Sequence, residues 1–200
     1  MNRGDSVSLV LPIVAGIAGI DEAGRGAWAG PVVAAVVCLA PDRPIQGLND
    51  SKKLSPAKRM ALADDIKNNA DDWALGYATS QEVDRLNVLQ ASMLAMQRAF
   101  HALNQCPIQA VVDGPICPAL SCPAQPLVKG DSQHASIAAA SILAKVERDA
   151  YMLRLHCQWP QYGFDRHKGY GTKVHRAALH QYGHCDAHRQ SFKPVLQAMA

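Results

Sequence analysis

A chain of 200 residues is a comfortable length for one domain and can bury about 70% of the surface that the unfolded chain exposes. Its 48% hydrophobic and 18% charged residues, without repeats or low-complexity tracts, are typical of an ordinary globular protein and exclude disordered and fibrous classes. The net charge of +3 is unevenly distributed, because the segment from Lys145 to the C-terminus carries +5 and the remainder −2. This distribution fits either a polyanionic ligand held near an acidic centre or a solvated basic helix face.

The first predicted elements are two buried strands over 10–21 and 31–39, both rich in Ala and β-branched residues and separated by a Gly-rich loop. We expect them to be antiparallel neighbours. The first run follows a basic residue, as in a weak secretory signal, but Pro12 and two glycines interrupt it. It is also too short to span a bilayer, which takes about 20 apolar residues. The pattern therefore predicts a strand and neither a signal peptide nor a membrane anchor.

The rest of the chain alternates helices with short strands. The first predicted helix begins at Ser55–Pro56 and has the apolar face Met60, Leu62 and Ile66. A strand over 73–79 follows, and then a helical region that is capped by Ser80 and runs to about Leu103 with a break near Asn87. The remaining elements are a strand over 108–113, a short strand before Asp131, a long helix to about Cys157, a loop over 160–170, and helices over 172–182 and 191–199. This order indicates a mixed α/β sheet flanked by helices.

Acidic side chains occur where the apolar strands end. Asp21 and Glu22 follow the first run, Asp113 ends the strand before a Gly-Pro turn, and Asp131 follows a later short strand. Ligand sites in open α/β sheets lie beyond strand ends, so these acids can converge. Adjacent residues of a strand face opposite ways, so Asp21 and Glu22 share one target only if the strand ends between them, and Gly24 makes such a turn easy.

Four carboxylates in one place repel each other, and a hard divalent cation such as Mg²⁺ or Mn²⁺ removes that conflict. Two such ions about 4 Å apart can hydrolyse a phosphodiester. Taken singly, each acid has a plainer explanation, because Asp131 suits a cap of the long helix and Asp113 suits a turn. The four acids together favour a metal site.

Basic, glycine and aromatic residues lie near these acids in the sequence. The Gly24-Arg25-Gly26 loop allows backbone groups to approach a sugar-phosphate and to address a 2′-hydroxyl, the atom that separates RNA from DNA. Lys52 and Lys53 either bind phosphates or are surface lysines before a helix cap.

The stretch YGFDRHKGYGTK combines aromatic with basic residues on a Gly-rich loop, which suits stacking on a sugar or base. Tyr162 and Phe164 are expected to anchor this loop in the core. Tyr170, bracketed by two glycines, is the better candidate for ligand contact.

Five ordered motifs closely resemble ribonuclease HII: GIDEAGRG, NDSKKLS, VVDGP, KGDSQHASIAAASILAKVERD and YGFDRHKGYGT. The resemblance extends from about Gly19 to the C-terminal helices. It implies an RNase H-like fold, with a mixed sheet flanked by helices and a C-terminal helical extension, and metal-dependent cleavage of the RNA strand of RNA–DNA hybrids. It also implies nicking on the 5′ side of a single ribonucleotide embedded in duplex DNA, which leaves 3′-hydroxyl and 5′-phosphate ends.

The resemblance implies roles for two sets of residues. The metal-binding acids fall on Asp21, Glu22 and Asp113, with Asp131 as the fourth catalytic acid, and the cofactor is Mn²⁺ or Mg²⁺. The substrate-contacting residues fall on Gly24, Arg25, Gly26 and Tyr170. Two positions depart from the family pattern. Ala27 and Trp28 stand where the family often has Pro-Leu, and Trp28 either fills the core beneath the loop or alters how the loop meets the substrate groove. His134 lies at a variable position and receives no role.

We expect a single catalytic domain over 1–200, in which about 160–200 form a loop-and-helix extension that binds substrate. The expected protein is a cytoplasmic monomer with reduced cysteines and a nucleic-acid partner, either an RNA–DNA hybrid or a DNA duplex containing ribonucleotides, with no small-molecule cofactor. Two alternatives remain open: another two-metal nuclease of the same fold, and a non-catalytic binder of RNA–DNA hybrids.

Overall fold

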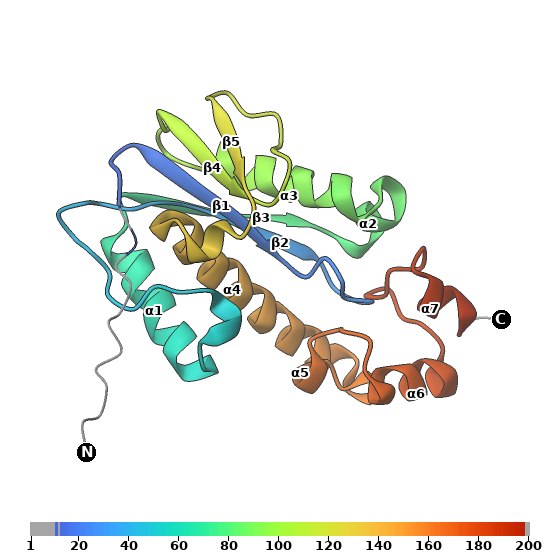
Figure 1. Cartoon of the computed structure of the whole chain (residues 1–200). Helices are drawn as coiled ribbons and strands as arrows, with labels where there is room; N and C mark the ends of the chain where they lie inside the picture. Colours follow the sequence, from blue (N-terminus) through green and yellow to red (C-terminus); the bar gives the residue numbers. More distant parts are fainter. Residues whose placement is uncertain (1–10, 12, 199–200) are drawn as a thin grey trace, which may run out of the picture.

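The computed structural model describes Leu11 and residues 13–198 (Figure 1). Within them five strands form one mixed sheet in the order β3-β2-β1-β4-β5. Its strands are β1 (Ile17–Ala23), β2 (Val32–Cys38), β3 (Asp72–Ala78), β4 (Gln109–Asp113) and β5 (Ala124–Leu127). The β1, β2 and β3 strands are antiparallel neighbours, whereas β4 and β5 run parallel to β1. The predicted mixed sheet and the antiparallel first pair are confirmed.

Helices cover both faces of this sheet (Figure 1). Helices α1 (Pro56–Asn69) and α4 (Ala135–Gln158) pack on one face, and α3 (Val88–His101), preceded by α2 (Ser80–Leu86), packs on the other. The small-residue face of α4 lies so close to β1 that a Cβ on Gly19 would overlap the backbone of Ser136. This close packing fixes the position of α4 relative to the strand that carries Asp21.

The C-terminal segment lies beyond the end of α4, apart from the helices that cover the sheet (Figure 1). It comprises the 3₁₀ turn η3 (Pro160–Tyr162) and the helices α5 (Phe164–His167), α6 (Lys173–Tyr182) and α7 (Lys193–Gln197). A small apolar cluster holds it to α4, with Tyr162 and Phe164 buried beside Met152, as predicted for these two aromatic residues. In the described part of the chain, no helix is long and apolar enough to cross a membrane.

Several predicted boundaries differ from the structure. Strand β1 begins at Ile17, after a turn at Gly16, and not at position 10, which lies outside the described residues. The cap of α2 is Thr79 and not the predicted Ser80, because the Thr79 side chain accepts the Glu82 N–H. The predicted loop over 160–170 contains η3 and α5.

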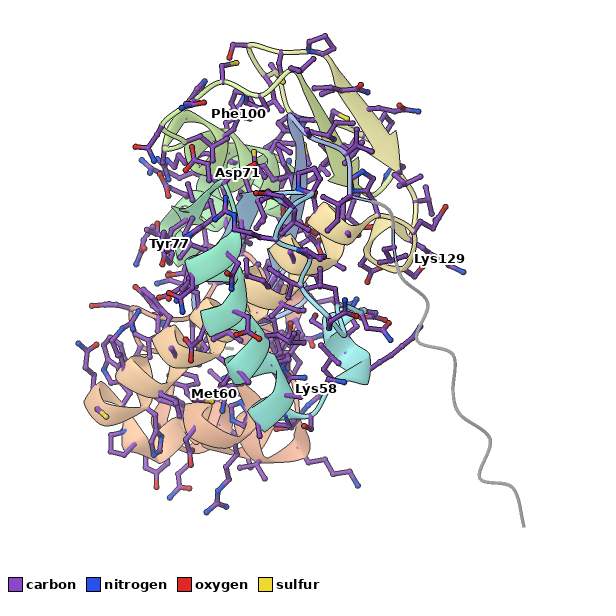
Figure 2. All side chains as sticks on the ribbon, turned by 90° about the vertical axis from the view of Figure 1, so that its left-hand side faces the viewer. Lys58, Met60, Asp71, Tyr77, Phe100 and Lys129 are labelled. Carbon is purple, nitrogen blue, oxygen red and sulfur yellow. The ribbon has the colours of Figure 1, made fainter. Side chains whose placement is uncertain are left out.

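Met60 does not belong to the apolar face of α1. Met60, which is labelled in Figure 2, is 61% exposed. In contrast, Leu62, Ala63 and Ile66 are buried. Residues two positions apart in an α-helix differ by about 200° around its axis, so Met60 points away from the face that Leu62 buries. The predicted break at Asn87 is confirmed, since its side chain caps α3.

Candidate active site

Asp21 and Glu22 both lie within β1, which pairs with β2 as far as Ala23. The expectation that the strand ends between the two acids is therefore wrong. Both side chains nevertheless line one cavity of about 510 Å³. The β4 strand pairs with β1 only up to Ile20↔Val112 and ends one residue later, at Asp113, so that the last residues of β1 extend past the end of β4. Carboxylates from opposite faces of the strand reach the same space at this open corner.

Asp113 occupies the position after Val112, which is the position beside Asp21 on the neighbouring parallel strand. Neighbouring strands lie about 5 Å apart, so the two acids are close. One Asp113 oxygen accepts the Gly130 N–H at 2.8 Å, which ties this strand end to the 3₁₀ turn η2 (Gly130–Ser132) that carries Asp131. The fold thus gathers four acids from three segments, although Asp113 and Asp131 are not among the residues that line the cavity.

The plainer explanation of Asp131 as a cap of the long helix does not hold. The cap of α4 is His134, whose Nδ1 atom accepts the Ser136 N–H at 3.3 Å. His134, to which no role was given, therefore has a structural one. Asp131 is instead buried in η2, with 9% of its surface exposed.

The carboxyl groups of Asp21, Glu22 and Asp131 resist ionisation. Burial raises the pKa of Asp21 well above its ordinary value, and the charges of Glu22 and Asp113 raise it further. Burial also raises the pKa of Glu22, although Arg25, 3.4 Å away, opposes that shift. The pKa of Asp131 is raised by burial and by its neighbours Asp50 and Asp113. Such a cluster has too much negative charge for its surroundings and favours a cationic ligand.

The donor set fits a hard divalent cation, because the site consists of carboxylate oxygens. In the described part of the chain, however, no three His, Cys, Asp or Glu side chains are arranged to hold one metal ion by themselves. Mg²⁺ is commonly bound by one or two carboxylates together with water and substrate phosphate oxygens. Asp21, Glu22 and Asp113 therefore fit sites that are completed by the substrate.

The cavity wall contains residues that the sequence patterns single out and others that they do not. Among the former are Gly24, Arg25, Gly26, Lys52 and Tyr170. Lys53 does not line the cavity and is exposed on the 3₁₀ turn η1 (Ser51–Lys53). Ser51, Ser141 and Lys145 were missed.

Two of these missed residues, Ser141 and Lys145, belong to α4, and the third, Ser51, is hydrogen-bonded to Ser141. The Ser141 hydroxyl donates to Ser51 Oγ at 2.8 Å, and Lys145 Nζ lies 2.6 Å from an Asp149 oxygen. Ser141, Lys145 and Asp149 follow each other at intervals of four residues on α4. Polar residues at every fourth position of this helix share one face, which is the signal that could have identified Ser141 and Lys145.

Tyr170 also lines the cavity and belongs to the segment between α5 and α6. Its ring is 38% exposed and covers the guanidinium of Arg148, with 5.2 Å between the Arg148 Cζ atom and the ring centroid. Its carbonyl accepts a hydrogen bond from His175 Nδ1 at 3.0 Å. The ring is thus held from behind while one face remains open to a ligand.

Trp28 joins the Gly24–Gly26 loop to the segment that carries Tyr170. Its N–H donates to the Gly169 carbonyl at 2.8 Å, and its own carbonyl accepts the Arg189 N–H at 2.8 Å. Its ring packs on Gly171 so closely that a Cβ there would overlap it, and it lies 5.4 Å from the His175 ring. Trp28 therefore fills the space beneath and between the two loops.

The ribonuclease HII family model matches residues 18–195 of this chain. A curated "Ribonuclease HII" from Dechloromonas aromatica (strain RCB) is 59% identical over 192 residues, which cover 96% of this chain and 97% of the relative. One from Bordetella avium (strain 197N) is 54% identical over 180 residues, with coverages of 90% and 89%.

Solved structures are also similar. The ribonuclease H2 from Pyrococcus horikoshii OT3 has a TM-score of 0.75 at 25% identity and covers 91% of this chain and 96% of its own. Bst-RNase HIII in complex with Mn²⁺ has a TM-score of 0.75 at 18% identity, with coverages of 96% and 70%, and supports the fold alone. The sheet order and the flanking helices are therefore those of an RNase H-like fold.

Proposed function

Because the chain belongs to the ribonuclease HII family, we propose that it nicks duplex DNA on the 5′ side of a single embedded ribonucleotide. Family membership makes it a metal-dependent endoribonuclease that acts on RNA–DNA hybrids. The finer activity rests on one observation: the Gly24-Arg25-Gly26 loop and Tyr170 line the same cavity as Asp21 and Glu22. A cavity that combines acids with backbone groups and an aromatic ring can hold a phosphodiester and the adjacent ribose together.

In the proposed mechanism Asp21, Glu22 and Asp113 would hold Mg²⁺ or Mn²⁺, and Asp131 completes the acidic cluster. When bound, such ions would supply activation of a water and stabilisation of the leaving oxygen of a phosphodiester. In the overall reaction the oxygen of one water bonds to the phosphorus and the bond to the 3′-oxygen of the preceding nucleotide breaks. The water loses one proton to solvent and the leaving oxygen takes one up, which gives a 3′-hydroxyl and a 5′-phosphate. Raised carboxyl pKa values support the placement of cations here, because the cluster is destabilised without them.

The substrate is proposed to lie across the sheet corner and the C-terminal segment. Backbone groups of Gly24, Arg25 and Gly26 contact the 2′-hydroxyl, and Tyr170 packs on the sugar at the RNA-to-DNA junction. Lys52, which lines the cavity, contacts a phosphate there, and the exposed Lys53 contacts the backbone outside it. The basic segment over about 160–200 binds the duplex as an extension of a single catalytic domain, in keeping with its excess of Lys and Arg.

The deciding experiment is a cleavage assay with a duplex that contains one ribonucleotide and a matched all-DNA duplex, in Mg²⁺ or Mn²⁺. We expect the first to be nicked on the 5′ side of the ribonucleotide, with a 3′-hydroxyl and a 5′-phosphate at the mapped ends, and the second to stay intact. Equal cutting of both duplexes would instead assign the chain to the general two-metal nucleases. Binding of hybrids without any cleavage would assign it to non-catalytic binders.

A further inference from the structure

Two arginines, Arg148 of α4 and Arg189 between α6 and α7, are completely buried. Among the described residues no ion pair includes either of them. Burial and the neighbouring Arg148 lower the pKa of Arg189 to about 9, so that it still carries its charge at neutral pH. A buried charge is costly unless hydrogen bonds compensate it. The partners of these guanidinium groups therefore indicate what the fold retains them for.

Backbone carbonyls of the loop between β1 and β2 are those partners. Arg189 donates through its two terminal nitrogens to the carbonyls of Gly24 and Arg25, each at 2.8 Å, and through Nε and one terminal nitrogen to that of Gly30 at 3.1 and 2.9 Å. Five N–H donors in a rigid fork make arginine suited to hold several carbonyls at once.

Arg148 holds the other end of the same loop. It donates to the carbonyls of Ala29 and Pro31 at 3.1 Å and to that of Lys168 at 2.9 Å. The two guanidinium groups together hold the loop at five residues, and Arg148 also connects it to the segment that precedes Tyr170. Of the two arginines, only Arg189 donates hydrogen bonds to the Gly-Arg-Gly part.

The hydrogen bonds of Arg189 fix the direction of two peptide groups. In a trans peptide the N–H points opposite to the C=O, and the structure contains no cis peptide among its described residues. With the carbonyls of Gly24 and Arg25 turned toward Arg189, the N–H groups of Arg25 and Gly26 point away from it. Neither N–H has a hydrogen-bond partner in the described part of the chain, and both residues line the cavity.

We propose that Arg189 is a positioning residue for ribose recognition. By holding the carbonyls of Gly24 and Arg25, it turns the N–H groups of Arg25 and Gly26, which belong to the same two peptide groups, toward the 2′-oxygen of the substrate. This inference rests on the proposed function. It assigns the C-terminal segment a second task besides duplex binding, since the segment also shapes the loop that distinguishes ribose from deoxyribose. Arg189 touches no substrate in this arrangement.

Asp84 of α2 provides an independent means to disturb Arg189. Its carboxylate accepts the N–H groups of Gln190 and Ser191 at 2.9 and 2.8 Å and the Ser191 hydroxyl at 2.6 Å. It therefore anchors the backbone that immediately follows Arg189 without contacting the loop or the cavity. Asp84→Ala loosens this anchor, and with it the position of Arg189, without changing the guanidinium group itself.

The test compares Arg189→Lys with the wild-type enzyme in Mg²⁺. Two quantities are measured: kcat/KM for the duplex with one ribonucleotide, and the inhibition constant Ki of the all-DNA duplex as a competitor. Lysine keeps the charge but cannot hold three carbonyls in one plane. We expect kcat/KM to fall about tenfold, equivalent to the loss of one hydrogen bond, while Ki stays within about twofold.

Arg98→Lys is the matched control. Arg98 likewise donates to a backbone carbonyl, that of Tyr77, and forms a bidentate pair with Glu82, but it lies on α3, away from the loop. It should change neither kcat/KM nor Ki. A general loss of packing, in contrast, would change both quantities in parallel in either variant.

The proposal is overturned if Arg189→Lys leaves kcat/KM unchanged, or lowers it only in proportion to the change in Ki. Should Arg189→Lys fail to fold by circular dichroism, Asp84→Ala decides: roughly a threefold fall in kcat/KM at constant Ki supports the proposal, and no fall overturns it. Failure of the proposed function is distinguishable from these outcomes, because the wild-type enzyme itself would then not cut the ribonucleotide duplex.

Discussion

The imidazole rings of His175 and His188 meet inside the C-terminal segment with their Nε2 atoms 3.0 Å apart. His188 Nδ1 accepts the Cys185 N–H at 3.0 Å, so its Nε2 carries the proton in the neutral ring and donates it to His175. His175 must then carry its proton on Nδ1, which lies 3.0 Å from the Tyr170 carbonyl. This chain of hydrogen bonds requires both rings to be neutral, and it ends at the residue proposed to contact the sugar.

Acid should therefore destabilise the protein through these histidines. Burial, with smaller effects of neighbouring histidines, lowers the pKa of His175 to about 4 and that of His188 to about 3, from an ordinary 6.5. The unfolded chain binds these protons at a higher pH than the folded one, so the stability that the neutral rings contribute is present above pH 6.5 and is lost as the pH falls. Each ring contributes a loss of about 2 kcal/mol between pH 7 and pH 5.

Urea denaturation at the two pH values measures this loss. In His188→Gln the decrease in the free energy of unfolding between pH 7 and pH 5 should be smaller by about 2 kcal/mol. His101→Gln, at an exposed position at the end of α3, is the control and should retain the wild-type decrease. An identical decrease in all three proteins would exclude His188 as its source.

Asp113→Asn should abolish turnover and leave the fold intact. The amide oxygen can still accept the Gly130 N–H, while the negative charge needed for the cation is lost. Because a metal contributes several kcal/mol to the transition state, we expect kcat to fall about a hundredfold or more. Cleavage assays and thermal melts measure the two effects, and a variant with the wild-type rate would remove Asp113 from the site.

Divalent ions should stabilise the acidic cluster. Since Asp21, Glu22 and Asp113 repel one another, Mn²⁺ or Mg²⁺ should raise the melting temperature of the wild-type protein, and chelation should reverse the rise. Asp113→Asn relieves part of the repulsion and removes a ligand, so that its melting temperature should respond less to the ion. The same response in both proteins would place the ion elsewhere.

Gly24→Ala should destabilise the protein much more than Gly26→Ala. A Cβ on Gly24 would overlap Arg148, and its φ of +100° disfavours any side chain. A Cβ on Gly26 meets nothing within 4 Å. We expect a loss of about 2 kcal/mol or more in the free energy of unfolding for the first and less than about 0.5 kcal/mol for the second. Equal losses would contradict the inference that Gly24 is needed because the Arg148 side chain packs directly against it.

Tyr170→Ala should weaken cleavage at RNA-to-DNA junctions, whereas Tyr170→Phe retains the ring and should not. The ring face is proposed to pack on the junction sugar, and aromatic contacts of this kind contribute about 1–3 kcal/mol. We therefore expect kcat/KM for junction substrates to fall roughly tenfold in the alanine variant, with metal-dependent stabilisation unchanged. A uniform loss on every substrate would argue against a sugar contact.

Local sequence was sufficient for much of the fold. Strands β2 and β4 follow from short β-branched runs, and the break at Asn87 follows from a residue that favours caps over helix interiors. The end of β1 did not follow, because ladder pairing with β2 extends the strand to Ala23, past two acids that disfavour strands. Tertiary pairing thus overrode local preference at the candidate site.

The amino-acid sequence by itself determined which chemical groups the site has: carboxylates at strand ends, a flexible Gly-Arg-Gly loop and an aromatic ring between glycines. Only the tertiary structure decided how these groups are held. Arg189 fastens the carbonyl of Gly24 from a position 165 residues away, and nothing in either local segment signals that contact. A buried guanidinium acquires its partners only when distant backbone is brought to it, because hydrogen bonds to carbonyls depend on geometry and leave no pattern in residue type.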